Sequence, residues 1–283
     1  MPETISNSIN SHRYPELYYR FPFLLRLHHF LVAATTLRVW YVRRIIGKLL
    51  KILPAPFRFL DAGCGAGDMI IPYMPDYRSS FFIGIDKIED NVAVCNAYTH
   101  KRDFLNSIFL KANVEEYVPD KPVDIITCIT VLQYVEDDIK ALNNFYEALI
   151  PGGYLVLYVP VNYDRVFHWY KWLTTKYFHS NEYDFRQGIK RHYTFDDVIK
   201  RLTSAGFIIT SSSYTYGTMG KIAYELYSMG LLIMQKLPWI PALFFAVLFI
   251  CGAYPFILLF MLFDFFHKKS HGNGLLVVAR KPN

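Results

Sequence analysis

A carboxylate followed by three alternating glycines is the part of the chain best suited to chemistry. Residues 57–70 read FRFLDAGCGAGDMI: an apolar segment, then Asp61, then Gly63, Gly65 and Gly67. Glycines in this pattern let the backbone turn sharply and approach a ligand, and the free amides of a following helix would attract an anionic group. We interpret the stretch as a cradle for a nucleotide-like cofactor. The alternative interpretation is a tight turn without a ligand.

A second acidic residue, Asp86, helps to identify the class of cofactor. The apolar segment 81–85 ends at Asp86, 19 residues after Gly67, where a carboxylate can accept hydrogen bonds from ribose hydroxyls. A dinucleotide site of the GxGxxG type would need glycine at position 68, but the residue there is Asp68. Asp61 would also add negative charge beside a pyrophosphate. The pattern therefore favours a cofactor that carries a positive charge near Asp61.

These residues resemble the class I S-adenosylmethionine-dependent methyltransferases, whose first motif is similar to LDAGCGAG and whose second strand ends in a ribose-binding acid. The resemblance covers most of residues 57–160. It implies S-adenosyl-L-methionine as the cofactor, with the glycine motif at its methionine end and Asp86 at its ribose. The cofactor-binding residues that we expect are Asp61, Gly63, Cys64, Gly65, Gly67, Asp86, Lys87, Asn113, Val114 and Thr130.

The adenine end of the cofactor is expected beyond the third strand. Residues 111–115, KANVE, follow that strand at the carboxyl edge of the sheet, where open α/β folds collect ligands. The family usually has aspartate where this chain has Asn113, and an amide carbonyl can still accept a hydrogen bond from the adenine amino group. The alternative is that Asn113 only ends the strand in a turn.

Candidate catalytic residues lie further along the chain. Residues 123–138, VDIITCITVLQYVEDD, resemble the family's fourth-strand segment, with Gln133 and Tyr134 where an acid and a histidine are usual. Methyl transfer depends mainly on alignment, so a strong base is optional. For a phenol or hydroxyl acceptor, Tyr134 and His192 are the candidates for removing a proton or orienting the acceptor. His192 belongs to an aromatic insert over 161–193, which we expect to roof the substrate pocket unless its aromatic residues simply pack.

Strands and helices are expected to alternate around this motif. After the first strand, we predict strands at 80–86, 107–112, 123–129, 153–159, 207–212 and 274–280. We predict helices at 66–75, interrupted by Pro72, and at 88–102, 135–149 and 194–204. The last of these should begin with Thr194 as the N-cap of a capping box, with the acid Asp197 three residues on. This order predicts an α/β, Rossmann-like class I methyltransferase fold with a mixed seven-stranded sheet. The expected domains are an N-terminal tail and basic amphipathic helix (1–53), a methyltransferase domain (54–213 and 274–283), and a hydrophobic helical insert (214–273).

Composition points to an anionic surface as a partner. The chain has 283 residues, 53% hydrophobic and 17% aromatic, with a net charge of +6 and a mean hydropathy of +0.16. Such a charge fits nucleic acid or a membrane. The Asn/Asp-Pro-Pro-aromatic loop of amino-directed DNA methylation is replaced by Thr130-Val-Leu-Gln133, so we expect no nucleic-acid partner.

We expect neither a metal site nor a disulfide framework. The four cysteines form no CxxC pair and mostly lie in apolar runs, which indicates reduced thiols: Cys64, Cys95, Cys128 and Cys251. His28 and His29 lie between apolar residues, where packing or interfacial roles are expected. The polar first ten residues predict no secretory signal.

A basic belt precedes the first strand. Residues 17–60 include eight arginines and lysines and no acidic residue. On a helical wheel, residues 38–53 place an apolar face opposite a basic one. This helix could have a solvated basic face or could lie on anionic lipid, and the sequence leaves both interpretations open.

An uncharged apolar run, residues 237–263, separates the last two strands and is long enough to span a bilayer. Strands six and seven must meet in one sheet, so a single crossing is excluded. Pro241, Gly252 and Pro255 are expected to divide the run into short pieces, which favours a re-entrant or interfacial hairpin on the cytoplasmic face of a membrane. The alternatives are an oligomer interface or a cap over a hydrophobic substrate.

Together these patterns predict a membrane-associated methyltransferase that acts on a lipid, quinone or isoprenoid-like acceptor. Two alternatives stay open: a soluble methyltransferase of a small amphiphilic molecule with the apolar segment as a dimer interface, and a non-catalytic cofactor-binding membrane scaffold.

Overall fold

The computed structural model describes residues 16–162, 164–170, 172 and 188–283. The chain folds into two compact units. The first comprises Met1–Val159, Gly188–Ser212 and Leu276–Asn283, and the second comprises Pro160–Gln187 and Ser213–Leu275.

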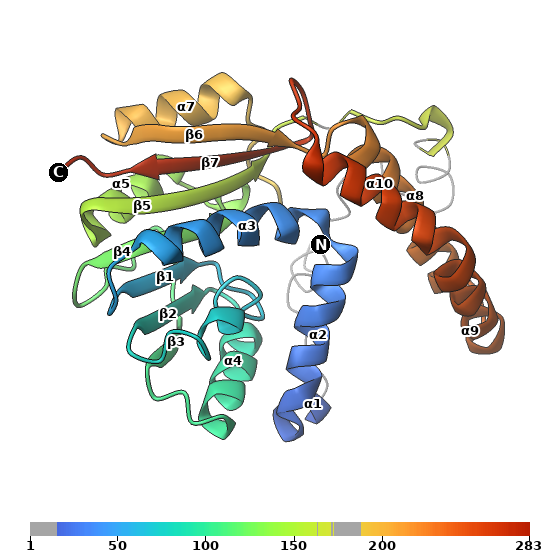
Figure 1. The fold of residues 1–283 in the computed structure, drawn as a ribbon, viewed down its shortest axis with the longest axis horizontal. Helices are drawn as coiled ribbons and strands as arrows, with labels where there is room; N and C mark the ends of the chain where they lie inside the picture. Colours follow the sequence, from blue (N-terminus) through green and yellow to red (C-terminus); the bar gives the residue numbers. More distant parts are fainter. Residues whose placement is uncertain (1–15, 163, 171, 173–187) are drawn as a thin grey trace, which may run out of the picture. The chain divides into compact units, whose positions relative to one another are not determined.

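A seven-stranded sheet in the order β3-β2-β1-β4-β5-β7-β6 organises the fold (Figure 1). Its strands are β1 (Arg58–Ala62), β2 (Phe81–Asp86), β3 (Ser107–Lys111), β4 (Val123–Ile129), β5 (Leu149–Pro160), β6 (Ile208–Thr215) and β7 (Gly274–Arg280). Strands β1 to β5 pair in parallel, and β7 is antiparallel. The predicted mixed sheet is confirmed, and β4 and β7 have the predicted bounds.

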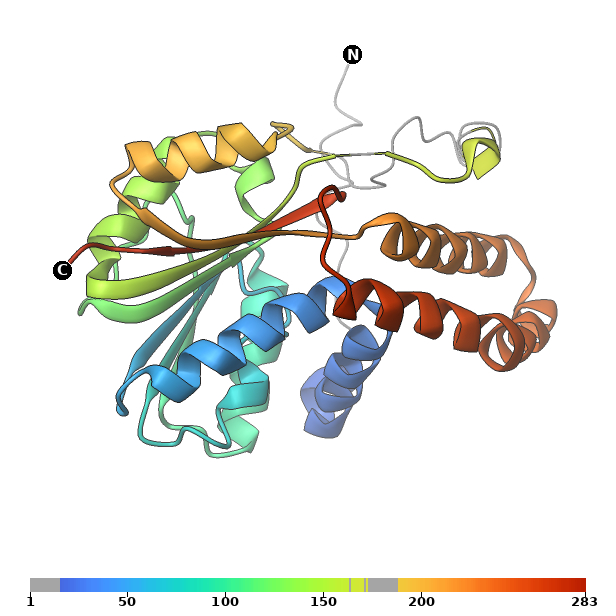
Figure 2. The same cartoon turned by 45° about the horizontal axis from the view of Figure 1, so that its top comes forward.

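Helices cover both faces of the sheet in the first unit. The helices α3 (Leu37–Ile52) and α4 (Glu89–Lys101) lie on one face, and α5 (Asp138–Ala148) and α7 (Phe195–Ser204) lie on the other (Figure 2). The predicted capping box that begins α7 is confirmed, because Thr194 and Asp197 satisfy each other's backbone amides. Two N-terminal helices, α1 (Glu16–Arg20) and α2 (Pro22–Thr35), precede α3.

Parallel pairing brings the ends of the first three strands together. Asp61 pairs with Gly84 in β2, and Asp86 pairs with Lys111 in β3. The carboxyl ends of parallel strands share one edge of a sheet, so both acids project near the same edge. The pairing of β1, β2 and β3 therefore brings Asp61 and Asp86, which are far apart in the sequence, to the same edge of the sheet.

The predicted helix at 66–75 is wrong. Turns follow Gly67, and the only regular element there is a 3₁₀ turn, η2 (Ile71–Tyr73). Pro72 has no amide hydrogen to continue a helical ladder, and Pro75 follows one turn later. The glycine motif, Gly63 to Gly67, is therefore followed by turns and not directly by the N-terminus of an α-helix.

The lipid-facing interpretation of residues 38–53 is also wrong. The apolar face of α3, including Val42, Ile46 and Leu50, is buried in the protein, while Arg44 and Lys48 are exposed. A face already packed in the core has no apolar surface left to insert into a bilayer. Helix α3 is thus a core helix with a solvated basic side.

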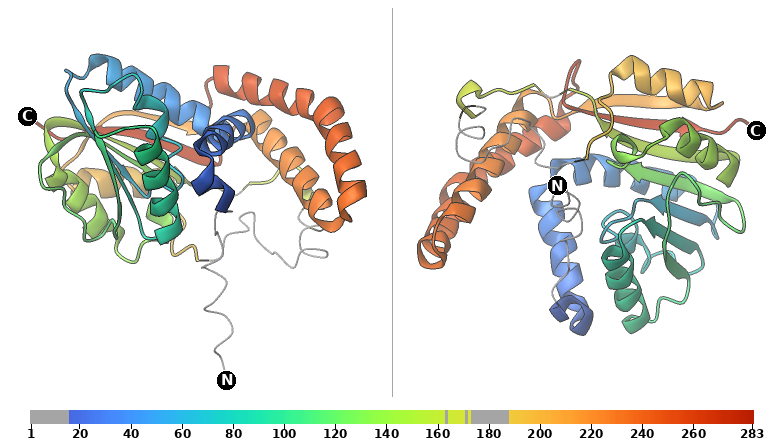
Figure 3. Two further views of the ribbon diagram at one scale, coloured as in Figure 1. Left: turned by 90° about the horizontal axis from the view of Figure 1, so that it is seen from below. Right: turned by 180° about the vertical axis from the view of Figure 1, so that it is seen from behind.

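The second unit contains a helical hairpin. Helix α8 (Thr218–Lys236) is followed by α9 (Trp239–Leu248), a π-helical segment η4 (Phe249–Ala253) and α10 (Tyr254–Phe266). Figure 3 shows α10 running antiparallel to α8, with α9 at the far end of the pair. At the opposite end, the buried Asp264 carboxylate of α10 accepts a hydrogen bond from Gly220 N, 3.0 Å away, in the first turn of α8.

The prolines do not divide this segment as predicted. Residues Trp239–Phe266 form one continuous helical stretch of 28 residues, long and apolar enough to cross a membrane. Pro241 lies in the first turn of α9, where an amide hydrogen has no helical partner anyway. Pro255 follows the π-helical turn at the start of α10, so the wider turn accommodates the missing donor.

Candidate cofactor-binding site

Asp61 is the most deeply buried carboxylate of the candidate site, with 2% of its surface exposed. Thr127 on the neighbouring strand donates its hydroxyl to Asp61 Oδ1 at 2.6 Å. Among the described residues, the buried Oδ2 atom has no hydrogen-bond partner. A buried acceptor without a partner is costly, so this oxygen is suited to receive a donor from a ligand.

Burial changes the protonation of this carboxyl group. Desolvation raises the pKa of Asp61 to about 7, the Thr127 hydroxyl opposes the rise, and the charges of Asp68 and Asp86 add to it. A cationic group beside Oδ2 would favour the ionised form and lower the pKa again. The site therefore favours a positively charged ligand group on electrostatic grounds.

The glycine loop has the backbone shape that only glycine adopts easily. Gly63, Gly65 and Gly67 have φ angles of +79°, +53° and +78°. A Cβ atom at Gly63 would lie 2.1 Å from Val131, whereas one at Gly65 would meet nothing within 4 Å. The loop thus packs against protein at Gly63 and faces open space at Gly65.

Asp86 fixes the loop from the end of β2. Its Oδ2 accepts the Gly65 amide at 2.9 Å and its Oδ1 accepts the Ile88 amide at 2.9 Å. The amides of Gly63 and Cys64 both donate to the Ile85 carbonyl. Each carboxylate oxygen keeps further acceptor capacity, which ribose hydroxyls could use.

Gly65→Ala should weaken S-adenosylmethionine binding at least 10-fold while lowering the free energy of unfolding by about 1 kcal/mol. The added methyl group would enter the open space in front of the loop, and alanine is strained at positive φ. Titration calorimetry and urea unfolding measure the two effects. Gly47→Ala is the matched control, because its Cβ also meets open space but lies on α3; equal losses of affinity in both variants would contradict the assignment.

The other expected cofactor residues surround this loop. Cys64 is buried, and its proximity to Cys95, together with burial, raises the pKa of its thiol, so it is a packing group. Val114 is buried beyond β3, and Lys87 is exposed after Asp86. Asn113 is exposed, and its side-chain carbonyl accepts the Glu115 amide at 3.2 Å. The turn role therefore exists in the structure, and one lone pair of that carbonyl remains for a ligand.

Thr130 ends β4 in a strained conformation. Its φ is +57°, which is unfavourable for a β-branched residue. Its amide donates to the Tyr158 carbonyl at 2.8 Å, and its carbonyl accepts from Gln133 Nε2 at 3.1 Å. Strain of this kind persists where surrounding contacts enforce it, and it occurs often at functional sites. The turn η3 (Leu132–Tyr134), with the half-buried Tyr134, follows directly.

The structure holds the segment that carries His192 against the loop that carries Tyr134. Lys190 N donates to the Gln133 carbonyl at 2.8 Å, and Arg191 donates to the Val135 carbonyl at 2.8 Å. The Tyr193 hydroxyl oxygen lies 3.2 Å from the Leu132 carbonyl oxygen. His192 itself is exposed. The two candidate catalytic residues thus come from adjacent segments, while residues 163, 171 and 173–187 of the predicted roof lie outside the described part of the chain.

A buried carboxylate anchors this segment. Asp138 accepts hydrogen bonds from Tyr193 at 2.7 Å and from Arg201 at 2.9 Å. Burial and the nearby Asp138 raise the pKa of Tyr193 well above its usual value. The tyrosine therefore stays a hydrogen-bond donor at every physiological pH.

Tyr193→Phe should lower the free energy of unfolding by about 1–2 kcal/mol, because it removes one donor to a buried carboxylate. The affinity for S-adenosylmethionine should change less than about twofold, since the polar contacts of the Tyr193 hydroxyl are with Leu132 and Asp138 and not with the glycine loop. Urea unfolding and calorimetry measure the two quantities. Unchanged stability would show that the Tyr193–Asp138 bond contributes nothing.

Two residues at the glycine loop were not predicted. His29 on α2 lies with Nε2 2.8 Å from the Ala66 carbonyl and 3.9 Å from Asp68 Oδ1. Burial lowers the pKa of His29, so its imidazole is neutral and can donate to Ala66. Arg43 on α3 donates to the Asp68 carbonyl at 2.8 Å. Helices α2 and α3 therefore contact the backbone of the glycine loop at Ala66 and of the turn after it at Asp68.

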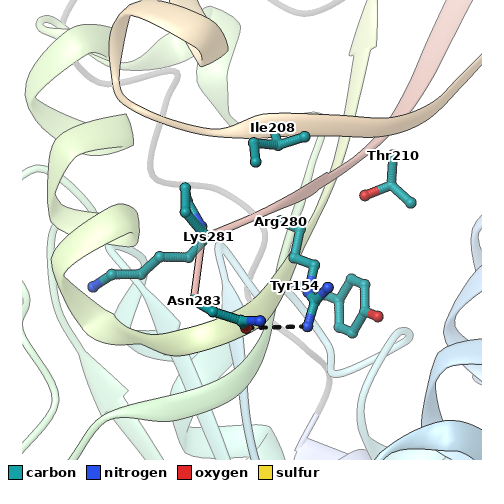
Figure 4. Close-up of a pocket in the computed structure, with 7 residues that line it drawn as sticks. Tyr154, Ile208, Thr210, Arg280, Lys281 and Asn283 are labelled. Carbon is teal, nitrogen blue, oxygen red and sulfur yellow. Dashed lines mark hydrogen bonds between the residues drawn. The ribbon is translucent and has the colours of Figure 1, made fainter.

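A pocket of about 380 Å³ opens at a different place in the first unit (Figure 4). Its lining residues come from β5, β6 and the C-terminal end of β7: Tyr154, Ile208, Thr210, Arg280, Lys281, Pro282 and Asn283. The cations already donate to backbone carbonyls, Arg280 to Gly152 and Lys281 to Leu149. Tyr154 lies in the amino-terminal half of β5, so this pocket is at the sheet edge opposite the glycine loop.

The geometry fits the cofactor that the sequence resemblance implies. The orphaned Asp61 Oδ2 matches the ammonium of a methionine group, the open face of Gly65 admits a close approach, and Asp86 lies where a ribose would hydrogen-bond. The described residues contain no cluster of three or more His, Cys, Asp or Glu side chains that could hold a metal ion.

Comparisons with known proteins agree with this fit. Residues 37–212 match the family described as "Methyltransferase domain". A ubiquinone biosynthesis O-methyltransferase of Rickettsia typhi is 27% identical over 100 residues, 35% of this chain and 39% of that protein. A trans-aconitate 2-methyltransferase of Rhodopseudomonas palustris is 28% identical over 123 residues, 43% of this chain and 46% of that protein. The chain thus spans less than half the length of these curated relatives.

The fold of this chain is also similar to that of a solved structure. A phosphoethanolamine N-methyltransferase of Haemonchus contortus, in complex with S-adenosylhomocysteine and phosphomonomethylethanolamine, superposes with a TM-score of 0.57 at 18% identity. The match covers 86% of this chain and 53% of that one. Since the matched residues 37–212 are more than half of the chain and carry the glycine loop with both acids, the protein belongs to the class I S-adenosylmethionine-dependent methyltransferases.

Proposed function

We propose that this chain methylates a hydrophobic small molecule, a lipid, quinone or isoprenoid-like acceptor, at the cytoplasmic face of a membrane. The observation that carries the proposal is the exposure of its apolar helical stretch. In the most apolar window of Trp239–Phe266, 6% of the residues are buried within the protein, and α9 has no buried residue. Soluble proteins rarely leave so large a contiguous apolar surface in water.

The termini of this stretch suit a membrane interface. Trp239 is exposed at its beginning, and His267 and Lys268 are exposed just beyond its end. Tryptophan and basic side chains concentrate at the boundary between hydrocarbon and headgroups. Because β6 and β7 are neighbours in one sheet, both ends of the hairpin return to the same side, which favours a monotopic or re-entrant attachment.

The role of the chain's own residues is to hold the cofactor and the acceptor in position for methyl transfer. When bound, S-adenosylmethionine supplies a methyl group on a positively charged sulfur, which a nucleophile can displace in line. Asp61 Oδ2 would hold the ammonium group, and Asp86 would hold the ribose. Tyr134 and His192 would orient the acceptor or accept its proton if the acceptor is a hydroxyl or phenol.

The names of the relatives cover acceptors of different chemistry, from ubiquinone biosynthesis to trans-aconitate. A quinone-like acceptor would reside in a membrane, which agrees with the exposed apolar hairpin. A small polar acid is dissolved in water, and an enzyme that methylates it needs no apolar hairpin. This contrast supports the hydrophobic class over the alternative of a soluble methyltransferase for a small amphiphile.

A partition assay tests the proposal. The full-length protein is incubated with methyl-labelled S-adenosylmethionine and, in parallel, with a total lipid extract and a water-soluble metabolite extract. We expect label in the organic phase of the lipid reaction, with Asp61→Asn as the inactive control. Label only in the water-soluble products would favour the soluble alternative, and no transfer by a protein that binds the cofactor would favour a scaffold; either result contradicts the proposal.

A further inference from the structure

Helix α2 is apolar on both sides, yet only one side is buried. Its sequence, PFLLRLHHFLVAAT, carries a single charged residue, Arg26. A helix that is apolar all round is normally buried all round. In α2, Leu25 and His29 are buried, whereas Phe23, Leu27, Phe30 and Leu31 are 62%, 47%, 68% and 51% exposed.

The two sets of residues occupy opposite faces. At 3.6 residues per turn, Phe23, Leu27 and Phe30 fall on one side of the helix, and Leu25 and His29 fall on the other. Helix α2 runs alongside α4 (Figure 1). The outer face can therefore be covered by a partner without disturbing the contacts of the inner face.

The inner face is connected to the cofactor loop. His29 reaches the carbonyl of Ala66, between Gly65 and Gly67, at 2.8 Å. The preceding helix α1 is fixed as well, because the Lys101 ammonium of α4 donates to the carbonyls of Tyr19 and Arg20 at 2.7 and 2.9 Å. Helix α2 is therefore connected to the backbone of the glycine loop through His29.

Charge identifies an occupant for the outer face. Arg20 and Arg26 are exposed beside the apolar side chains, and residues 17–60 contain no acidic residue. Aromatic and aliphatic side chains flanked by arginine match the boundary between acyl chains and anionic headgroups. A surface that binds another protein more often carries charges of both signs.

We propose that α2 is an interfacial helix whose outer face, formed by Phe23, Leu27, Phe30 and Leu31, binds an anionic lipid surface while His29 holds the glycine loop, so that membrane binding strengthens cofactor binding. This inference rests on the proposed membrane attachment but concerns a different helix from the α8–α10 hairpin. It makes the bilayer a positive effector of the site, because lipid contact favours the docked position of α2 in which the loop is already shaped.

Site-specific fluorescence tests the lipid contact. A Cys251→Ser background removes the exposed cysteine and leaves the buried Cys64, Cys95 and Cys128. An environment-sensitive dye on Leu27→Cys should shift to the blue with phosphatidylglycerol/phosphatidylcholine vesicles, and iodide quenching should fall about threefold. The same dye on Lys48→Cys, on the exposed side of α3, is the control and should not respond.

Flotation of the unlabelled protein with the same vesicles separates this inference from the proposed function. If the protein floats but the dye at position 27 does not respond, α2 does not bind lipid and the inference is wrong, while membrane attachment stands. If the protein does not float and the dye does not respond, both are wrong. A response that appears without vesicles and grows with protein concentration would indicate a second copy of the chain and would also overturn the inference.

Calorimetry tests the coupling to the cofactor. Vesicles should tighten S-adenosylmethionine binding by about fivefold or more in the wild-type protein. In His29→Ala the dye at position 27 should still respond, but the vesicle effect on cofactor affinity should be lost. His28→Ala is the matched control, since the contact with Ala66 belongs to His29. A vesicle effect that survives in His29→Ala, or that is absent from the wild-type protein, would overturn the coupling.

Discussion

Asp61→Asn is expected to weaken S-adenosylmethionine binding by about 100-fold or more. The substitution keeps an oxygen for the Thr127 hydroxyl, which lies 2.6 Å from Asp61 Oδ1, but it removes the charge that would face the cofactor's ammonium group. Leaving a buried charge without its partner costs about 3–5 kcal/mol, and 1.4 kcal/mol corresponds to a factor of 10 in affinity. Titration calorimetry measures the loss.

The same residue predicts how binding depends on pH. Because burial raises the pKa of Asp61 to about 7, the cofactor-free site is mostly protonated at pH 6. Binding of an ammonium group requires the carboxylate, so it releases a proton, and affinity should rise roughly 10-fold between pH 6 and 7.5. Above that range the cofactor's own amino group begins to lose its proton. Asp61→Asn should flatten this profile.

A linked effect on stability has the opposite sign. Without cofactor, Asp61 keeps its proton in the folded chain up to about pH 7, whereas the unfolded carboxyl group loses it near pH 4. The contribution of Asp61 to the free energy of unfolding therefore falls as pH rises through this window.

The matched control for the loss of charge is Asp120→Asn, which removes a carboxylate that is 75% exposed. Equal cofactor affinity in wild-type and Asp61→Asn proteins would contradict the site.

Charging the apolar hairpin is the second large expected effect. The double variant Leu243→Glu/Phe244→Glu should reduce partition onto anionic vesicles by at least about 100-fold, because it removes two apolar side chains from the contact and adds two like charges. Both side chains are mostly exposed on α9, so the fold should be kept. The affinity for S-adenosylmethionine in the absence of vesicles should stay within about twofold of wild type.

Vesicle flotation measures this partition. Leu105→Glu/Val118→Glu is the matched control, since both residues are exposed and apolar and lie in the first unit. The control should float like the wild-type protein. Flotation of the Leu243→Glu/Phe244→Glu variant at the wild-type level would show that α9 does not contact lipid.

Local sequence signals predicted most of the sheet. Alternating strands and helices, the glycine motif and the Thr194 capping box are written in neighbouring residues, and the structure confirms the mixed sheet with β4 at Val123–Ile129 and β7 at Gly274–Arg280. The exception near the motif is the expected helix at 66–75. There, two prolines outweigh the helical interpretation that the motif invites.

The contacts that complete the candidate site could not be predicted, because they join distant parts of the chain. The Thr127 hydroxyl and Asp61 are 66 residues apart, and His29 and Ala66 are 37 residues apart. Both contacts follow from the register of β1 with β4 and from the packing of α2, which only the folded chain defines. A buried polar residue in an apolar run, such as His29, was the available signal.

The sequence could not predict which apolar helix faces are exposed to solvent. Helix α3 and helix α2 both combine apolar and basic residues, and the amphipathic pattern of α3 made it the better membrane candidate. The structure buries the apolar face of α3 and leaves Phe23 and Phe30 of α2 exposed. Periodicity identifies a face, but only packing shows whether the protein itself covers that face.

Surface dilution measures the central claim most directly, which is methyl transfer to an acceptor dissolved in a membrane. The lipid extract that accepts methyl groups is mixed into vesicles at a fixed total amount, while inert phosphatidylcholine is added to the same vesicles. If the enzyme takes its acceptor from the bilayer, the initial rate should fall in proportion to the acceptor's share of the surface. A rate that depends only on the bulk acceptor concentration, or no transfer into lipid at all, would contradict the account.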